Sequence, residues 1–454
     1  MKSKFAEELL LFIAVLKWVV LATFIGTIVG LSTTAFLKAL SWMTNLSTNF
    51  PYYYFFIPVV FVISALLIRY LAPDAEGHGT EKVIEAVHTR AGRINILVVP
   101  VKLIASVITI AFGGSAGKEG PCAQIGAGLS SAFADIFKFD DIDRKRFVIC
   151  GISAGFASVF GTPIAGAIFG VEVLFIGDLL YEALLPSFIA GMTSYHISYS
   201  LGIRYFYHPF NFVPVFSESF FLKIVLVGVL FGFTSLLFIE IMRYGKYISE
   251  KININKILKG IIGGIPLVIF GFFVSKQYFG LGLETIESCL AGRGIFIFAF
   301  LLKMIFTSIT LNFGGSGGVV TPIFFIGVTA GMFFAKVFNL DIATFSALGF
   351  VSLLAGAANT PIAASIMAVE LFGAKIAPYA AVSSVISYLM TGHRSVYPSQ
   401  ILSITKSPSI KVDTGREIEE VEPVVLPREK SITGVILRRI KKVKKHIQND
   451  KTKK

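Results

Sequence analysis

Long apolar runs, separated by short polar or glycine-rich stretches, dominate the chain from near its beginning to about residue 372. The runs cover residues 9–31, 55–68, 94–112, 147–176, 220–241, 257–274, 295–313, 323–338 and 348–372. A helix that crosses a bilayer needs about 20 apolar residues, and several runs reach that length. Others are shorter and interrupted by glycine, as in re-entrant or broken helices. The pattern predicts an all-α polytopic membrane protein.

The composition supports lipid as the main solvent of this chain. Hydrophobic residues make up 54% and charged residues 15% of the sequence, and the mean hydropathy is +0.75, values unlike those of a water-facing surface. The first run is too long, and lacks a suitable small-residue cleavage site, for a removable signal peptide, so we expect a permanent first helix. Cys122, Cys150 and Cys289 lie in or beside apolar runs without CxxC spacing, which indicates neither a disulfide framework nor a zinc site.

Positive charge is concentrated at the end of the chain. The formal net charge is +13, and from Ser403 onward there are 14 Lys and Arg residues against 7 Asp and Glu residues, with a basic run at 438–445. Nucleic-acid binding is one interpretation of such a run. Beside so many apolar segments, we instead expect a short basic cytoplasmic tail at 403–454, held near anionic lipid.

Three blocks of sequence occur twice, in the same order, which indicates an internal duplication. The pairs are FGGSAGKEGPCAQIGAG from Phe112 and FGGSGGVVTPIFFIGVT from Phe313, TPIAGAIFGVEVLF from Thr162 and TPIAASIMAVELF from Thr360, and GHGTEKVIE from Gly77 and GLGLETIES from Gly280. We therefore expect residues 1–18 to form the cytoplasmic N-terminus and the start of the first helix. Residues 19–210 and 211–402 would form the first and second membrane repeats.

Duplicated halves with glycine-broken apolar segments at matching places are typical of transport proteins, whose substrate site lies near the midplane of the membrane. A helix that begins inside the membrane exposes unpaired N–H groups and the positive end of its dipole, and such helix ends attract anions. The glycines could instead serve only close helix packing. Three glycine-rich helix starts in a duplicated frame favour a shared anion site.

At these blocks the sequence resembles the CLC family of chloride channels and anion/proton exchangers, over about residues 19–403. The family's motifs stand here as GHGTE at 77–81, GKEGP at 117–121, GVVTP at 318–322 and Tyr397; the second is complete, and the first and third are partial. The resemblance implies two inverted-topology repeats of broken and tilted helices, with both termini cytoplasmic. It also implies a homodimer with one pathway per subunit, in the cell membrane, that transports chloride or a similar small anion and uses no cofactor.

Glu119 is the principal candidate functional residue. The resemblance implies that its carboxylate occupies the anion path when ionised and swings away when protonated, so that it is both gate and proton acceptor. A carboxylate that caps its own helix N-terminus is the structural alternative, and it rests on the same attraction. Lys118 would concentrate anions at the pathway mouth or would extend to the lipid headgroups. Gly120, in the same motif, belongs to the implied anion site.

The other implied anion ligands are His78, Val319, Val320 and Tyr397. The two valines would offer backbone N–H groups, and Tyr397 would direct its hydroxyl at the anion from the cytoplasmic side. His78 stands where the family often has a serine. Imidazole can both donate a hydrogen bond and titrate, so the change bears on selectivity and on the response to pH.

Channel-like conduction and proton-coupled exchange are the two modes that the resemblance leaves open. Val173 stands where exchangers commonly carry an inward proton-transfer glutamate, and it has no titratable atom, which favours conduction. The alternative is an anion/proton antiporter with another proton route. The neighbouring Glu172 and its repeat partner Glu370 are better explained as structural partners of groups at helix ends.

Two rival functions have weaker support. An enzyme is suggested by GISAG at 151–155, which satisfies GxSxG, but the run around it is apolar and helical instead of strand-turn-helix. GGSAGKEG lacks the first glycine of a nucleotide-binding loop, and Glu119 replaces its Ser or Thr. A cation transporter is suggested by Glu119, Glu172 and Glu370, although helix N-termini and Lys118 favour anions. The chain is therefore predicted not to be an enzyme.

Overall fold

The computed structural model describes residues 2–208, 217–426, 431–432 and 434–435. Sixteen α-helices form within these residues, eight in each half. The first half holds α1 (Lys2–Thr48), α2 (Ile57–Leu71), α3 (Thr80–Thr89), α4 (Val98–Ala111), α5 (Glu119–Ile136), α6 (Asp141–Phe160), α7 (Pro163–Glu172) and α8 (Leu184–Ser200). The second half holds α9 (Glu218–Lys251), α10 (Lys256–Phe273), α11 (Leu283–Leu290), α12 (Ala299–Asn312), α13 (Val320–Val337), α14 (Ile342–Ala358), α15 (Pro361–Phe372) and α16 (Ala377–Met390).

Short elements complete the chain. Six 3₁₀ turns lie among the described residues: η1 (Tyr53–Phe56), η2 (Pro73–Ala75), η3 (Tyr181–Ala183), η4 (Lys276–Tyr278), η5 (Ala374–Ile376) and η6 (Ile418–Glu420). The strands are β1 (Phe175–Ile176), β2 (Ile401–Leu402), β3 (Ile410–Lys411) and β4 (Val424–Val425). β1 pairs in parallel with β2, and β3 pairs antiparallel with β4.

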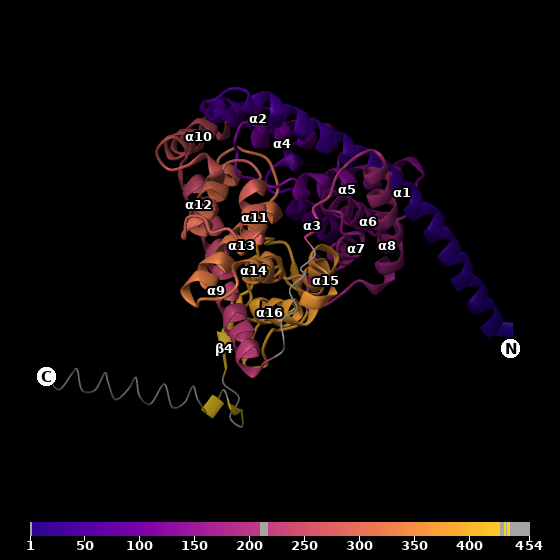
Figure 1. The fold of residues 1–454 in the computed structure, drawn as a ribbon. Helices are drawn as coiled ribbons and strands as arrows, with labels where there is room; N and C mark the ends of the chain where they lie inside the picture. Colours follow the sequence, from indigo (N-terminus) through magenta and orange to yellow (C-terminus); the bar gives the residue numbers. More distant parts are fainter. Residues whose placement is uncertain (1, 209–216, 427–430, 433, 436–454) are drawn as a thin grey trace.

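The helices of the second half repeat the packing of the first. α5 packs on α6 as α13 packs on α14, and α1 packs on α8 as α9 packs on α16. The halves lie side by side, with α2 against α10 and α7 against α15 (Figure 1). This is the arrangement of two inverted repeats of broken helices that the sequence predicts. The expected boundary between residues 210 and 211 lies outside the described residues.

Contacts between the halves are reciprocal, as a two-fold relation requires. Glu172 at the end of α7 accepts hydrogen bonds from Ile362 N at 3.0 Å and Ala363 N at 2.8 Å, at the start of α15. Glu370 on α15 accepts the equivalent pair, from residues 164 and 165 at the start of α7. Each glutamate satisfies two orphan N–H groups of the helix start in the other half. The prediction that these glutamates are structural partners at helix ends is confirmed.

Two of the long apolar runs each contain two helices. The run 147–176 breaks between α6 and α7, where Gly161 adopts φ +71°, and the run 348–372 breaks between α14 and α15, where Asn359 adopts φ +57°. Pro163 and Pro361 then begin the next helices at their first positions, where proline costs no hydrogen bond. These breaks create the N-termini of α7 and α15, whose N–H groups Glu370 and Glu172 satisfy.

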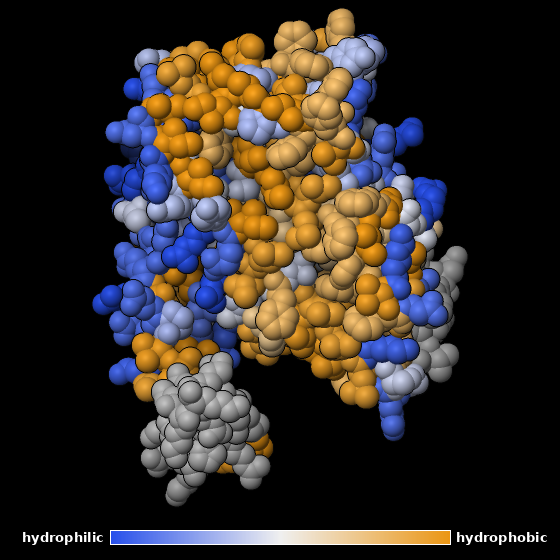
Figure 2. All heavy atoms as spheres, turned by 90° about the vertical axis from the view of Figure 1, so that its left-hand side faces the viewer, coloured by the Kyte–Doolittle hydropathy of each residue, from blue (hydrophilic) through white to orange (hydrophobic). Residues whose placement is uncertain are grey.

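A broad apolar face covers the outside of the molecule. Figure 2 shows hydrophobic residues in a band, with hydrophilic residues at both sides, on the face that includes α9, α10 and α12. Four of the described helices are long and apolar enough to cross a membrane, namely Phe5–Thr48, Tyr53–Leu71 with its leading 3₁₀ turn, Glu218–Lys251 and Val320–Val337. Six further apolar helices have 10 to 17 residues. Together with the fold, this apolar face identifies a multi-pass membrane protein.

The first part of the expected tail folds back onto the helices. Ile176 of β1, Leu402 of β2 and Ile418 of η6 form a small apolar cluster. Ile418 N also donates to Gln400 O at 2.8 Å. This C-terminal segment, residues 401–426, is therefore packed against the membrane domain, whereas the basic run at 438–445 lies outside the described residues.

Candidate functional site

Three glycine-rich segments meet at one point, because their glycines allow backbone to touch backbone. A Cβ added to Gly79 would lie 2.4 Å from Gly120 O, and one added to Gly120 would lie 2.2 Å from His78 O. A Cβ on Gly318 would lie 2.6 Å from Gly120 N. Only glycine permits this approach. The GHG loop, the start of α5 and the start of α13 therefore converge, as the sequence predicts.

A two-stranded bridge joins the loops that lead into α5 and α13. Gly117 N donates to Gly318 O and Gly318 N donates to Gly117 O, both at 2.7 Å. On either side, Ser115 N donates to the Thr310 hydroxyl at 3.0 Å, and Ser316 N donates to the Thr109 hydroxyl at 3.1 Å. The bridge fixes the two helix N-termini with respect to each other.

Glu119, the first residue of α5, directs its carboxylate across the bridge to the start of α13. Oε1 accepts from Val320 N at 2.5 Å, and Oε2 accepts from the Thr321 hydroxyl at 2.7 Å. The side chain is only 1% exposed. In the duplicated frame Val320 is the counterpart of Glu119, so the carboxylate of one half occupies the helix end of the other.

This geometry has a direct chemical meaning. N–H and hydroxyl donors at a helix N-terminus form an anion site, and here a carboxylate holds it. A small anion at the same place would need those donors, so it would compete with the Glu119 carboxylate for them. Protonation of Glu119 would remove the negative charge that these donors stabilise.

His78 and Tyr397 form a second polar position beside the first. Their ring centroids lie 6.4 Å apart, at 52° between planes. His78 Nδ1 is buried without a hydrogen-bond partner, and the buried Tyr397 hydroxyl makes no hydrogen bond of normal geometry, with Thr80 as its polar neighbour. Buried polar atoms without partners are costly and rare. Here two such atoms lie on rings whose centroids are 6.4 Å apart.

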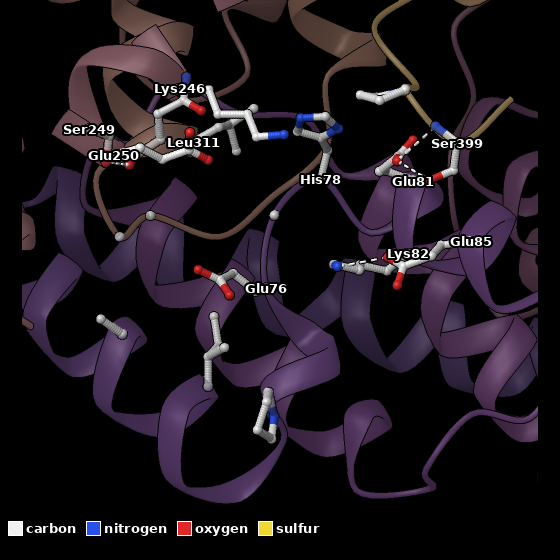
Figure 3. A pocket seen from close by; sticks show the side chains of 18 of the residues that line it. Glu76, His78, Glu81, Lys82, Glu85, Lys246, Ser249, Glu250, Leu311 and Ser399 are labelled. Atoms are coloured by element: carbon white, nitrogen blue, oxygen red, sulfur yellow. Dashed lines mark hydrogen bonds and ion pairs between the residues drawn. The ribbon is translucent and has the colours of Figure 1, made fainter. Parts of the chain in front are cut away.

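A cavity of about 910 Å³, the vestibule, opens onto His78. Its walls come from α2, α3, α9, the start of α10, the end of α12 and the C-terminal segment. Lys246 from α9 extends toward His78, while Glu81 and Lys82 lie on α3 just beyond it (Figure 3). The vestibule thus reaches His78, and Pro398 and Ser399, which follow Tyr397 in the chain, form part of its wall.

The remaining candidates lie close to Glu119, with different surroundings. Lys118 directly precedes it, is partly buried, and is near enough to interact electrostatically with Glu119 and Cys122. Val319 is buried at the N-cap of α13, where its carbonyl accepts from Ile323 N at 2.9 Å. Val320 supplies its backbone N–H, and Gly120 supplies a close approach of backbones.

Three residues near the site, Thr321, Glu81 and Ser399, were not predicted from the sequence. The Thr321 hydroxyl binds the Glu119 carboxylate directly. Glu81 accepts from Ser399 N at 3.0 Å and from the Ser399 hydroxyl at 2.6 Å, which joins α3 to the loop that carries Tyr397. Thr321 could have been found as a hydroxyl at the start of an intramembrane helix, but the pairing of Glu81 with Ser399 spans 318 positions and has no local signal.

Val173 and Ser153, which bear on proton transfer and on enzyme activity, have defined surroundings in the structure. Val173 is buried directly after α7, and its carbonyl accepts from the Gln400 side-chain amide at 2.7 Å. Ser153 of the GxSxG match lies within α6 and donates to Ala167 O at 3.3 Å, so no strand-turn-helix elbow surrounds it. Among the residues that the structure describes, no group of three or more His, Cys, Asp or Glu side chains is placed to hold a metal ion.

Comparison with known proteins agrees with this geometry. The model of the voltage gated chloride channel family matches residues 60–392. A chloride/fluoride channel protein of Pseudomonas syringae pv. tomato is 34% identical over 89% of this chain and 91% of its own length. An uncharacterised protein of Methanocaldococcus jannaschii is 28% identical over 85% of this chain and 96% of its own length.

Solved structures show the same fold. A CLC-type fluoride/proton antiporter superimposes with a TM-score of 0.81 at 29% identity, over 85% of this chain and 98% of the antiporter. A slow cyanobacterial Cl⁻/H⁺ antiporter gives 0.72 at 19% identity, over 82% and 94% of the two chains. The match to the family model and the 34% identical relative, together with the duplicated helix ends around Glu119, show that the chain belongs to the CLC family of anion channels and transporters.

Proposed function

We propose that this protein moves small halide ions, chloride or fluoride, across a membrane in exchange for protons, with Glu119 as the gate. The observation that carries the proposal is the Glu119 carboxylate at the start of α13, bound by Val320 N and the Thr321 hydroxyl. Because anion and carboxylate compete for the same donors, occupancy by an anion and protonation of Glu119 are thermodynamically linked.

The named relatives support this choice of substrate and mode. The 34% identical bacterial relative carries the name chloride/fluoride channel, and the 29% identical structure is that of a fluoride/proton antiporter. Both act on small halides. The His78–Tyr397 pair, with its buried Nδ1 and hydroxyl, offers donors to such an ion after it leaves water.

Passive, channel-like conduction is the second candidate, and Val173 favours it. The position expected to pass protons inward has no titratable atom and is buried between Gln400 and the end of α7. A charge in apolar surroundings is expensive, so exchange requires another proton route. Without one, Glu119 would gate a passive anion flux.

Cation transport has less support from the site. Glu119, Glu172 and Glu370 each accept hydrogen bonds from backbone N–H groups. Donors of that kind stabilise negative charge, and these carboxylate oxygens are therefore already engaged. An enzyme has no comparable support, since Ser153 is held within a helix.

We further propose the arrangement of the protein in its membrane. Residues 19–210 and 211–402 are assigned as the two inverted repeats, with both termini in the cytoplasm and the vestibule open to the cytoplasm. The protein is assigned to the cell membrane as a homodimer with one pathway per subunit. Inter-subunit cross-linking in membranes would test the dimer.

The experiment that tests the proposed function measures anion and proton movement together. Purified protein is placed in sealed liposomes with an outward gradient of chloride, fluoride or gluconate. Exchange predicts that chloride or fluoride, but not gluconate, drives protons uphill, and that Glu119→Ala abolishes this pumping while halide flux continues. Halide flux without pumping in the wild type would support passive conduction and overturn the exchange proposal.

A further inference from the structure

The vestibule contains a carboxylate, Glu81, that can carry a proton, which the side chain of Val173 cannot. Glu81 lies in the first turn of α3, three positions after His78, and it lines the vestibule. Its Oε1 is engaged by Ser399, two positions after Tyr397. Glu81 therefore stands between the two segments that carry the second polar position.

The other oxygen of Glu81 is the unusual feature. Oε2 is buried and has no hydrogen-bond partner. The same is true of His78 Nδ1 and of the Tyr397 hydroxyl. A buried acceptor without a donor costs about 1 to 3 kcal/mol. Gain of a proton at Oε2 neutralises the carboxylate while the hydrogen bonds from Ser399 to Oε1 remain.

Charged groups from several elements line the vestibule together with Glu81. The basic ones are Arg69 of α2, Lys82 of α3, Lys246 of α9 and Lys259 of α10. The acidic ones are Glu76 before α3, Glu85 of α3, Glu250 of α9, and Glu417 and Glu419 of the C-terminal segment. Lys82 is paired with Glu85 at 2.7 Å (Figure 3). Lys246 is paired with Glu419 at 3.2 Å. The cavity can therefore admit anions and protons alike.

Three of the carboxylates that line the vestibule are Glu81, Glu85 and Glu417. Burial, and then the charges of Glu420, Glu85 and Glu419, raise the pKa of Glu417 above its ordinary value. Glu417 and Glu85 thus lie close enough to interact, and both line the vestibule together with Glu81, which is three positions after His78. Successive ionisable groups of this kind avoid placing a bare charge in apolar surroundings.

We propose that Glu81 is the cytoplasmic proton station of this protein. In the inward direction the acid O–H of Glu119 returns its proton through the His78–Tyr397 position to the Glu81 carboxylate, which releases it to vestibule water; the outward direction is the reverse. This inference rests on the proton exchange proposed above. It assigns to α3 the proton-transfer role that the resemblance to the family implies at the end of α7, where Val173 cannot carry a proton.

The competing explanation is that Glu81 only positions Tyr397 by holding Ser399. Two variants separate the two roles. Glu81→Gln keeps an amide oxygen that can accept from Ser399 but cannot carry a proton. Ser399→Ala removes one of the two hydrogen bonds and leaves the carboxylate. Glu250→Gln makes the same chemical change on another wall of the vestibule and serves as the matched control.

The experiment measures the ratio of protons to halide ions moved in liposomes, for the wild type and the three variants. A proton station predicts at least a tenfold fall in that ratio for Glu81→Gln, with Ser399→Ala and Glu250→Gln near the wild type. A fall in Ser399→Ala with a normal ratio in Glu81→Gln would overturn the proposal in favour of positioning alone. Normal coupling in all variants would overturn it and leave exchange intact, whereas halide flux without coupling in the wild type would overturn both. Retained halide flux, measured in the same liposomes, shows that each variant is folded.

Discussion

The hydroxyl of Thr321 provides a quantitative test of the gate. It donates to Glu119 Oε2 at 2.7 Å, and both side chains are 1% exposed. A hydrogen bond to a charged group contributes about 1.5 to 3 kcal/mol. Thr321→Val removes this donor with little change of shape, while Val320 N keeps its bond to Oε1. The ionised carboxylate is then held less tightly by that amount.

Loss of this bond favours the protonated, released form of Glu119 at higher pH. Since one pH unit corresponds to about 1.4 kcal/mol, the pH of half-maximal halide flux should rise by about 1 to 2 units. The assay is halide efflux from liposomes as a function of external pH. Thr329→Val is the matched control, because Thr329 lies on the same helix and donates to Phe325 O instead. An unchanged midpoint in Thr321→Val, or a shift toward acid, would refute the competition between anion and carboxylate.

Three further predictions follow from other parts of the structure. His78→Ser should shift the chloride/nitrate permeability ratio, because it replaces a buried ring donor with a smaller hydroxyl; unchanged selectivity in a well-expressed protein would leave His78 a structural residue. Glu172→Ala should lower the thermal unfolding temperature in detergent more than Glu370→Ala does, because Glu172 is more deeply buried. Each charge-assisted hydrogen bond contributes about 1.5 to 3 kcal/mol. Equal effects of the two variants would contradict this ranking. The raised pKa of Glu417 means that its protonated form is favoured in the folded state. Docking of the C-terminal segment should therefore be strongest at acid pH and weaken as pH rises through that pKa. Hydrogen exchange of residues 401–426 should show this pH dependence, and Glu417→Gln should remove most of it.

The sequence predicted the parts of the fold that depend on local pattern. The duplicated blocks and the glycines before α5 and α13 were enough to place Glu119 at an intramembrane helix start. The role of Glu172 and Glu370 at helix ends followed from the cost of a buried charge. These features are readable because residue type and chain position alone determine them.

Other parts could not be predicted from local pattern. α8 and α16 contain many serines and tyrosines and were absent from the apolar runs, because helices that pack mainly on protein need no continuous apolar surface. The partner of Glu119 is the start of α13, about 200 positions away, and the match of Glu81 with Ser399 is equally remote. Such pairs arise from the two-fold packing of the halves, which no single segment records.

Halide affinity as a function of pH tests the central claim most directly, namely that the Glu119 carboxylate occupies an anion site. Titration calorimetry on purified protein with chloride and with fluoride would compare the wild type with Glu119→Ala. Competition predicts that wild-type affinity for the transported halide rises as pH falls, and that the variant binds it at least as tightly with little dependence on pH. The same pH dependence in both proteins would contradict the account, because the group that competes with the anion would then be something other than Glu119.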